Sequence, residues 1–317
     1  MNRFLLFLLL PFLGLAQNTF QMGNKESAPT NGSIEIDINK DIKGTLLLPN
    51  TDKPIPLVIL FTGIGPNDRN GNSMMNRSDS HKQLAAALDS AGIATYRYDK
   101  RTFTMLKENR MKDDVSFDDF VTDAKAVIHY FDNDKRFSKT ILAGHSQGSL
   151  VAMLAMDESI DGFISIAGPA DPIDQTIVQQ VATQAPGLDK ELEQVFKKMK
   201  SQDSLVSKIN PYLISVVGPQ VQPFMKSWMK YDPKEVIKDL EIPVLVVNGT
   251  RDRQVDVAQA EKLHAALPES KLVIVENMDH LFKKVGKDDI EAAKSNTDPR
   301  FPLHPELVAS IISFVKQ

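Results

Sequence analysis

Positions 140–152 read Thr140-Ile141-Leu142-Ala143-Gly144-His145-Ser146-Gln147-Gly148-Ser149-Leu150-Val151-Ala152 and give the clearest indication of the fold. The first four residues suit a buried strand, and the last four begin a helix. Between them stands G-x-S-x-G, the motif in which a serine occupies a sharp strand-to-helix turn with its hydroxyl exposed. Glycine is needed on both sides because the turn is tight and the flanking backbone packs closely. We therefore predict that Ser146 is a nucleophile.

Short apolar runs rich in valine and isoleucine recur along the chain, at 56–61, 163–166, 243–247 and 272–275. Near-continuous apolar runs of this length suit strands that are buried on both faces of a parallel sheet. Stretches with helical spacing lie between them and at the C-terminus. Because strand–helix alternation requires crossover connections, the sequence predicts an α/β fold with a mostly parallel central sheet flanked by helices.

The segment near the N-terminus follows a different pattern. Residues 33–38 and 45–48 alternate between apolar and polar side chains, which is typical of an antiparallel hairpin at the edge of a sheet. The sequence contains no internal repeat and no low-complexity tract. We expect one core formed by residues 33–169 and 241–317.

Between residues 170 and 240 the alternation stops, and only helical patterning is found. The segment could form two extra core helices or a cap over a site. It follows the predicted strand at about 162–167, and open α/β sheets bind ligands at the strand ends, so we favour a helical cap. The apolar side chains of Phe224, Trp228 and Met229 would then form an adaptable substrate-binding wall.

A nucleophilic serine needs a positioned base, and the sequence contains six histidines. Five lie in helical stretches or inside the serine motif, where structural histidines are common: His81, His129, His145, His264 and His304. His280 stands in Asn277-Met278-Asp279-His280-Leu281-Phe282, directly after an apolar strand near the C-terminus. That is where the last member of a Ser–Asp–His chain order belongs, so we predict that His280 is the base.

The carboxylate that orients the base should lie between Ser146 and His280, at the end of a strand. The apolar run 243–247 leads through Asn248-Gly249-Thr250-Arg251 into Asp252, which we predict fixes the imidazole tautomer and stabilises the imidazolium. Asp256 is the nearest alternative. Asp279 is too close to His280 in sequence to be preferred.

An oxyanion hole requires two backbone N–H groups directed at the developing negative charge. One should come from Gln147, the residue after the nucleophile. The other should come from the loop Thr62-Gly63-Ile64-Gly65-Pro66, in which the N–H of Ile64 is the expected donor. The flanking glycines would let this loop bend towards the serine.

Composition excludes several classes of function. The chain has no cysteine, so disulfides, cysteine-based zinc or iron–sulfur sites and thiol nucleophiles are ruled out. Its net charge of −4 argues against a nucleic-acid partner. No H-E-x-x-H spacing occurs, and the acidic run at 132–134 is too short for a calcium loop. We expect no metal and no organic cofactor.

The first sixteen residues have the features of a secretory signal peptide. A short basic start precedes the apolar run 4–10, and Gly14-Leu15-Ala16 provides a small-residue end. The apolar stretch is too short for a membrane span of about 20 residues. We expect cleavage after Ala16, a flexible segment at 17–32, and an exported protein, periplasmic or extracellular, without a stable membrane anchor.

With these features together, the chain resembles the α/β-hydrolase superfamily, and within it the serine aminopeptidase-like, or Hydrolase_4-like, branch. The resemblance covers roughly residues 38–317 and includes, beyond the serine motif, the stretches 65–72, 97–102, 227–233, 248–255 and 279–282. It implies the α/β-hydrolase fold and hydrolysis of carboxylic esters. The family usually has His-Gly-Ser-Gly-Pro where this chain has residues 62–66, so a branched side chain at Ile64 would narrow the acyl pocket. Asp68, Arg69, Asp99 and Arg101 are expected to form loop-fixing ion pairs.

The leading hypothesis is therefore a serine esterase that acts on a small-molecule ester with an apolar acyl group. An exported aminopeptidase or amidase with the same triad is the alternative. It would need a cap carboxylate to hold the substrate amine, for which the candidates are Asp189, Glu191, Glu193 and Asp203. A binding module with little turnover is disfavoured, because such a protein would have no need of all three triad residues.

Overall fold

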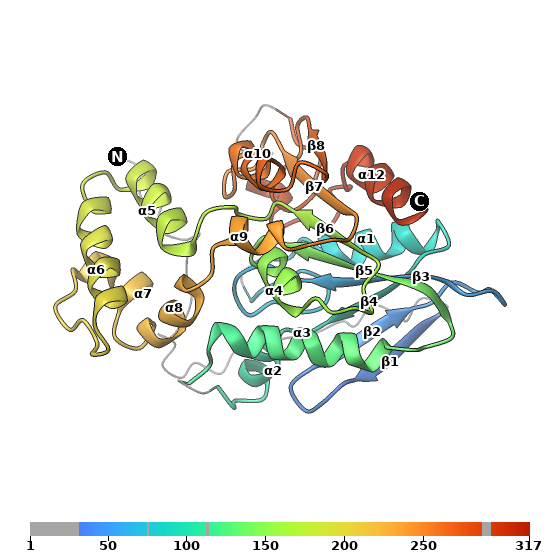
Figure 1. Ribbon diagram of the computed structural model, residues 1–317, viewed down its shortest axis with the longest axis horizontal. Helices are drawn as coiled ribbons and strands as arrows, with labels where there is room; N and C mark the ends of the chain where they lie inside the picture. Colours follow the sequence, from blue (N-terminus) through green and yellow to red (C-terminus); the bar gives the residue numbers. More distant parts are fainter. Residues whose placement is uncertain (1–31, 75, 112–113, 287–292) are drawn as a thin grey trace.

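The apolar run that precedes Ser146 forms strand β5 (Phe137–His145), which lies inside an eight-stranded sheet (Figure 1). The computed structural model describes residues 32–74, 76–111, 114–286 and 293–317. The predicted signal peptide and most of the segment that follows it lie outside these residues. Along the sheet the strand order is β1-β2-β4-β3-β5-β6-β7-β8. The predicted fold class is confirmed.

The strands from β3 to β8 run parallel to one another, whereas β2 is antiparallel to both of its neighbours. The hairpin predicted at the edge of the sheet is therefore present. The other strands are β1 (Ser33–Asp37), β2 (Lys43–Leu47), β3 (Ile55–Phe61), β4 (Ala94–Tyr98), β6 (Gly162–Ile166), β7 (Val244–Gly249) and β8 (Lys271–Val275).

The sequence pattern did not predict β4, although all five of its residues are buried. Its sequence Ala94-Thr95-Tyr96-Arg97-Tyr98 places polar side chains at alternate positions and breaks any continuous apolar run. Arg97 is only 6% exposed, and its guanidinium donates to Asn70 Oδ1 at 2.7 Å. The pairing of β4 with β2 and β3, rather than its own hydrophobicity, explains why this segment is a strand.

Successive strand residues point to opposite faces of the sheet, and each face has its own apolar cluster. On β3, Leu57, Ile59 and Phe61 join one cluster, while Val58 and Leu60 join the other. Helices α3 (Phe117–Phe131), α4 (Gln147–Ala155), α9 (Pro233–Lys238) and α10 (Val257–Ala266) contribute to the first cluster. Helices α1 (Ser80–Asp89) and α12 (Pro305–Val315) contribute to the second. Helices on both faces bury the carboxyl-terminal halves of the central strands β3 and β5 and all of β6 and β7. A short helix, α2 (Arg101–Lys107), follows β4.

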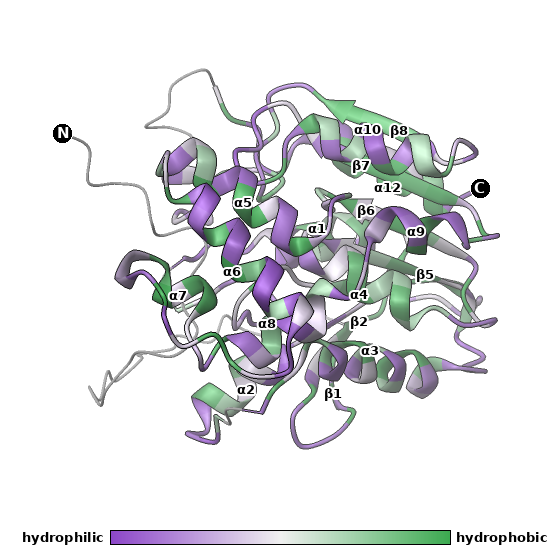
Figure 2. Ribbon diagram, turned by 60° about the vertical axis from the view of Figure 1, so that its left-hand side comes forward, coloured by the Kyte–Doolittle hydropathy of each residue, from purple (hydrophilic) through white to green (hydrophobic). Residues whose placement is uncertain are grey.

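After β6 the chain forms α5 (Ile173–Gln184), α6 (Asp189–Ser201), η1 (Pro211–Leu213), α7 (Ile214–Val217) and α8 (Gln222–Met229). We call residues 170–232 the cap. Figure 1 shows α5 to α8 gathered on one side of the molecule, away from α12. Figure 2 shows α5 and α6 alternating between hydrophilic and hydrophobic residues, whereas β7 and β8 are mostly hydrophobic. This alternation is expected of helices that bury one face only.

The cap meets the core through aromatic side chains of α8 and α3. The ring of Trp228 stacks on Phe117 at a centroid distance of 5.2 Å, and Phe224 lies 5.8 Å from Phe120. Ser227 Oγ accepts a hydrogen bond from the backbone N–H of Phe117 at 2.8 Å. These contacts fix α8 against the N-terminal end of α3.

Helix α9 differs from our expectation that the cap extends to residue 240. It packs against α4 and α10 of the core. Because β6 and β7 are parallel neighbours, the chain must return from the carboxyl edge of the sheet to the amino edge before β7 begins. α9 forms part of this return, so it belongs to the core. Among the described residues, no helix is long and apolar enough to span a membrane.

Candidate active site

Ser146 lies between β5 and α4 in a strained backbone conformation, with φ 52° and ψ −121°. A positive φ is unfavourable for a residue with a side chain and persists only where the surroundings enforce it. Here the Ser146 N–H donates to Ile166 O at 2.9 Å, and the N–H of Ser149 donates to Ser146 O at 3.0 Å. The predicted turn is present at the predicted residue.

The two glycines of the motif are required by close backbone contacts. A Cβ atom at Gly144 would lie 2.4 Å from Gly148 O, and one at Gly148 would lie 2.5 Å from Phe61 O. Neither distance is compatible with a side chain. The first turn of α4 therefore packs closely against the carboxyl ends of both β3 and β5.

His280 and Asp252 are paired, as the sequence predicted. His280 Nδ1 and Asp252 Oδ2 are 2.7 Å apart, and the Asp252 side chain is completely buried. Asp252 Oδ1 accepts hydrogen bonds from the backbone N–H groups of Gln254 at 2.8 Å and Val255 at 2.9 Å. Each oxygen of this carboxylate therefore has a donor. The alternative, Asp256, is the N-cap residue of α10, and its side chain makes no capping hydrogen bond.

The loops that carry Asp252 and His280 are joined by backbone hydrogen bonds. Thr250 N–H donates to Val275 O, and Arg251 N–H donates to Met278 O, each at 3.0 Å. Within the second loop, Asp279 Oδ1 accepts from the N–H groups of Leu281 and Lys283 at 2.9 and 2.8 Å. Asp279 therefore organises the histidine loop, and burial raises the pKa of its carboxyl group.

His145, inside the serine motif, also contacts the histidine loop. Its Nε2 lies 3.0 Å from the carbonyl oxygen of His280, and the two rings are 4.7 Å apart. A carbonyl only accepts, so His145 Nε2 carries the hydrogen. Burial lowers the pKa of His145 well below its ordinary value, and the nearby His280 and His81 lower it further. A neutral His145 with its proton on Nε2 thus links the strand of Ser146 to the loop of His280.

The loop after β3 brings Gly63 beside Ser146. A Cβ atom at Gly63 would lie 3.2 Å from Ser146 Cβ. The carbonyl oxygen of Gly63 accepts from Asn67 Nδ2 at 3.1 Å and from Lys100 Nζ at 2.8 Å. In a trans peptide the C=O and N–H groups point in opposite directions, so the Ile64 N–H is directed away from Lys100.

Lys100 was not identified from the sequence. It is only 6% exposed, and besides Gly63 O its amine donates to Gln147 Oε1 and lies 4.3 Å above the ring centroid of Phe120. Burial lowers its pKa to about 7, against a smaller opposing effect of Asp123. The available signal was its position directly after an alternating segment that forms β4.

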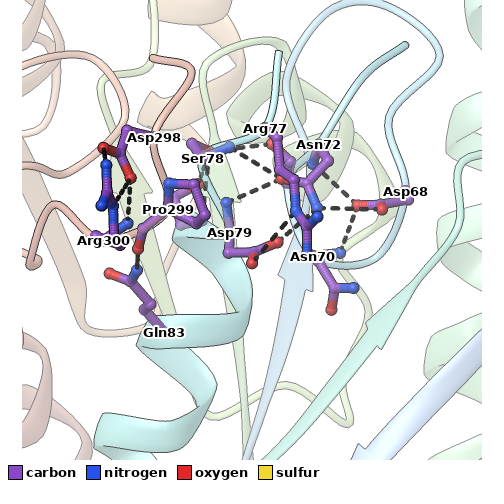
Figure 3. Close-up of polar contacts among 12 residues, drawn as sticks. Asp68, Asn70, Asn72, Arg77, Ser78, Asp79, Gln83, Asp298, Pro299 and Arg300 are labelled. Carbon is purple, nitrogen blue, oxygen red and sulfur yellow. Dashed lines mark hydrogen bonds and ion pairs between the residues drawn. The ribbon is translucent and has the colours of Figure 1, made fainter. Parts of the chain in front are cut away.

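Asp68, Asn72 and Asp79 belong to a loop that is held together by its own side chains (Figure 3). Asp68 Oδ1 accepts from the N–H groups of Asn70 and Asn72, and Asn72 Oδ1 accepts from those of Ser78 and Asp79. In these bonds, side-chain oxygens of the loop accept from backbone N–H groups of the same loop. This segment fixes the chain between the Gly63 loop and α1.

Arg69, Asp99 and Arg101 form ion pairs as expected and attach this region to the core, whereas Asp68 accepts hydrogen bonds from N–H groups of its own loop instead. Arg69 binds Asp99 through two guanidinium nitrogens, at 3.1 and 2.8 Å, and Arg101 binds Asp123 in the same two-pronged way at 2.6 and 2.7 Å. Bidentate pairs of this kind are strong and directional. They hold residues 99–101, and with them Lys100, at the carboxyl end of β4.

A cavity of about 40 Å³ opens beside Ser146. Ile64 and Gln147, the two predicted oxyanion-hole residues, line it together with the serine. From the cap it is lined by Ile173, Thr176, Gln180, Gln184 and Trp228, and from the loop after β7 by Arg253, Gln254 and Val255. The predicted nucleophile, the two predicted donor residues and side chains of the cap therefore line the same cavity.

Of the three predicted substrate-binding residues, only Trp228 lies on this cavity. Phe224 and Met229 are buried, and the ring of Phe224 packs against Phe120 and Trp228. They share one apolar helical face with Trp228, but that face mainly packs against the rest of the protein. The cap contributes amide and hydroxyl groups from α5 in addition to Trp228.

Comparison with known protein families gives two matches. Residues 73–216 match a family model described as serine aminopeptidase, S33, and residues 225–289 match one described as TAP-like protein. The first stretch contains Ser146, and the second contains Asp252 and His280. The chain belongs to the α/β-hydrolase superfamily. The resemblance inferred from the sequence is confirmed.

Among curated relatives of this α/β-hydrolase is Esterase EstD of Thermotoga maritima, which is 28% identical over 260 residues. The aligned region covers 78% of this chain and 59% of EstD. The chain thus spans about three fifths of the length of that relative.

Solved structures with the same fold include Est1E from Butyrivibrio proteoclasticus, with a TM-score of 0.55 and 17% identity over 90% of this chain and all of Est1E. XC6422 from Xanthomonas campestris, described as an α/β serine hydrolase without a lid, has a TM-score of 0.51 and 17% identity. That match covers 92% of this chain and 97% of XC6422. At these identities the similarity establishes the α/β-hydrolase fold alone.

Proposed function

We propose that this α/β-hydrolase cleaves carboxylic esters, with Ser146 as nucleophile, His280 as general base and acid, and Asp252 as the orienting carboxylate. The observation that carries the proposal is the buried His280–Asp252 pair at 2.7 Å, on the same edge of the sheet as the strained serine. The relative named Esterase EstD supports an ester as the substrate class.

In the proposed acylation step, Ser146 Oγ forms a bond to the ester carbonyl carbon while its proton passes to His280. The carbonyl electron pair moves onto oxygen, giving a tetrahedral intermediate whose negative charge accepts from the N–H groups of Ile64 and Gln147. Collapse breaks the carbon–oxygen bond to the alcohol, and His280 protonates the departing oxygen. Asp252 stabilises the imidazolium in between.

Deacylation follows the same sequence with water in place of the alcohol. His280 takes a proton from water as the water oxygen bonds to the acyl carbon. The second intermediate then releases Ser146 Oγ, which regains a proton from His280, and the carboxylic acid departs. The ester is thereby split into one alcohol and one acid, and the enzyme is regenerated.

The cavity supports a short, apolar acyl group. A volume of about 40 Å³ is well below the roughly 150 Å³ that holds a molecule such as benzene. Ile64 and Trp228 offer it apolar contacts, and the branched Ile64 stands beside the serine. Thr176, Gln180 and Gln184 provide hydrogen-bonding groups for a polar alcohol portion.

An aminopeptidase would need a carboxylate near the serine to hold the substrate amine. The four candidate carboxylates are absent from the lining of the described cavity. Instead, Asp189 accepts from Gly187 N–H, Glu191 from Asn210 Nδ2, and Glu193 pairs with Lys197. The absence of these four carboxylates from the lining of the described cavity therefore argues against a substrate amine.

The test is hydrolysis of p-nitrophenyl esters from acetate to palmitate, beside aminoacyl p-nitroanilides. We expect the wild type to prefer short esters and Ser146→Ala to lose turnover by a factor of at least about 10⁴. Ser138→Ala, the same change at the exposed amino end of β5, is the matched control and should retain wild-type rates. Faster anilide turnover, or ester turnover that survives Ser146→Ala, would refute the proposal.

A further inference from the structure

The Lys100 amine contacts both segments that carry the proposed oxyanion-hole donors. It donates to the carbonyl of Gly63, which precedes Ile64, and to the side-chain oxygen of Gln147. Gln147 is 2% exposed, and its Nε2 has no hydrogen-bond partner among the described residues. The bond from Lys100 is therefore the interaction that holds this side chain.

The Gly63 contact controls the direction of a donor. The oxygen of the Gly63–Ile64 peptide accepts from Lys100 and Asn67 together, so the peptide plane is fixed from one side. The N–H on the opposite side belongs to Ile64. A positively charged donor on the carbonyl also polarises the peptide and makes its N–H a stronger donor towards negative charge.

The cost of burying this amine indicates that its position matters. A lysine is seldom fully buried, because the charged form loses hydration. Here the ammonium is surrounded by the Phe120 ring and two oxygen acceptors. A small cavity beside it is lined by Tyr98 of β4 and Asp123 of α3, and Asp123 is paired with Arg101 of α2. The ring of His145 also lies beside Gly63, where a Cβ atom would be 3.5 Å from Nδ1 of the ring.

We infer that Lys100 is a positioning residue of the oxyanion hole: it orients the Gly63–Ile64 peptide and the Gln147 segment, and its charge stabilises the tetrahedral intermediate through them. This inference rests on the proposed function. Lys100 touches neither Ser146 nor the substrate in this role, and acts through the two donors.

The test compares wild type, Lys100→Met and Lys139→Met. Lys139 lies at the amino end of β5, so Lys139→Met makes the same side-chain change far from the site. Three quantities are measured: kcat and KM for p-nitrophenyl acetate, the rate constant for labelling of Ser146 by a fluorophosphonate, and the thermal unfolding midpoint. Labelling also develops negative charge in the hole, but it needs no particular ester.

We expect Lys100→Met to lower kcat and the labelling rate constant by the same factor, about ten- to a hundredfold, with KM changed less than about threefold. The unfolding midpoint should not fall, and Lys139→Met should behave as wild type. The ratio of wild-type to Lys100→Met rates should be greatest below pH 7 and should decline as the pH rises, because Lys100 loses its charge near pH 7.

Rates for Lys100→Met within twofold of wild type would overturn the inference. So would a loss of rate matched by a loss of unfolding temperature, since that would mean a structural role only, and so would a ratio independent of pH. If wild type is labelled but hydrolyses no ester, the proposed substrate class fails while labelling still tests Lys100. If wild type is not labelled at all, both proposals fail.

Discussion

The two walls of the cavity differ in how their side chains are held. On the core side, Asp252 accepts two backbone hydrogen bonds and pairs with His280, and the Gly63 carbonyl accepts from the side chains of Asn67 and Lys100. On the cap wall, Gln180 makes one bond, to Gln254 O, and its Oε1 has no partner among the described residues. Gln184 and Thr176 stand on the same helix.

This difference suggests a division of labour. Groups that must act on a transition state need fixed positions, since small displacements cost large factors in rate. Groups that select a substrate need only offer contacts. We therefore assign chemistry to the core wall and substrate selection to the cap wall.

The largest expected effect falls on the core wall. Asp252→Asn should keep the fold but hold His280 in the wrong tautomer, lowering kcat by about 10³–10⁴. The measurement is steady-state hydrolysis of p-nitrophenyl acetate, with the circular dichroism spectrum checked for the native fold. Asp256→Asn, the same change four residues later, should leave kcat near wild type. The opposite ranking would mean that the orienting carboxylate was misassigned.

A smaller effect is expected on the cap wall. Trp228→Ala should enlarge the cavity and raise the ratio of hexanoate to acetate ester turnover, in kcat/KM, by about tenfold. Phe224→Ala removes a neighbouring aromatic ring that does not line the cavity, so it should lose stability without changing that ratio. If Trp228→Ala left the dependence of kcat/KM on acyl chain length unchanged, the assignment of substrate selection to the cap wall would be wrong.

A third effect concerns stability rather than rate and separates Lys100 from purely structural core residues. In the unfolded chain its pKa is about 10.5, and in the folded protein it is about 7. Between these values the unfolded chain binds more protons, so the contribution of Lys100 to the free energy of unfolding rises as the pH rises. Chemical denaturation should show Lys100→Met more stable than wild type by roughly 1–3 kcal/mol at pH 7, and the gap should narrow towards pH 10. A variant less stable at every pH would contradict this.

The sequence predicted the serine turn and the histidine–aspartate pair because their positions follow from chain order. Ser146, Asp252 and His280 each follow an apolar run, and the carboxyl ends of parallel strands meet at one edge. No knowledge of side-chain packing was needed. The hairpin and the parallel strands around β5 were predictable for a different reason. The spacing of apolar residues along the chain reflects which side chains are buried.

What the sequence could not supply was the partner of each apolar or charged side chain. Periodicity placed Phe224, Trp228 and Met229 on one helical face, but only the structure shows that Phe224 packs against Phe120 of α3. The amine of Lys100 could not be located from a segment with alternating polar residues. The boundary between the cap and the core could not be predicted either. Helix α9 is helical like its neighbours, and only its packing assigns it to the core.

The proposed use of backbone amides at positions 64 and 147 would have an evolutionary consequence. Every amino acid except proline carries the same N–H group, so exchanging the side chain at position 64 would alter the shape of the pocket without deleting a donor. Substrate preference could therefore drift at this position while the reaction persists. A lineage could pass from a small to a branched residue there, one mutation at a time, through intermediates that all remain active.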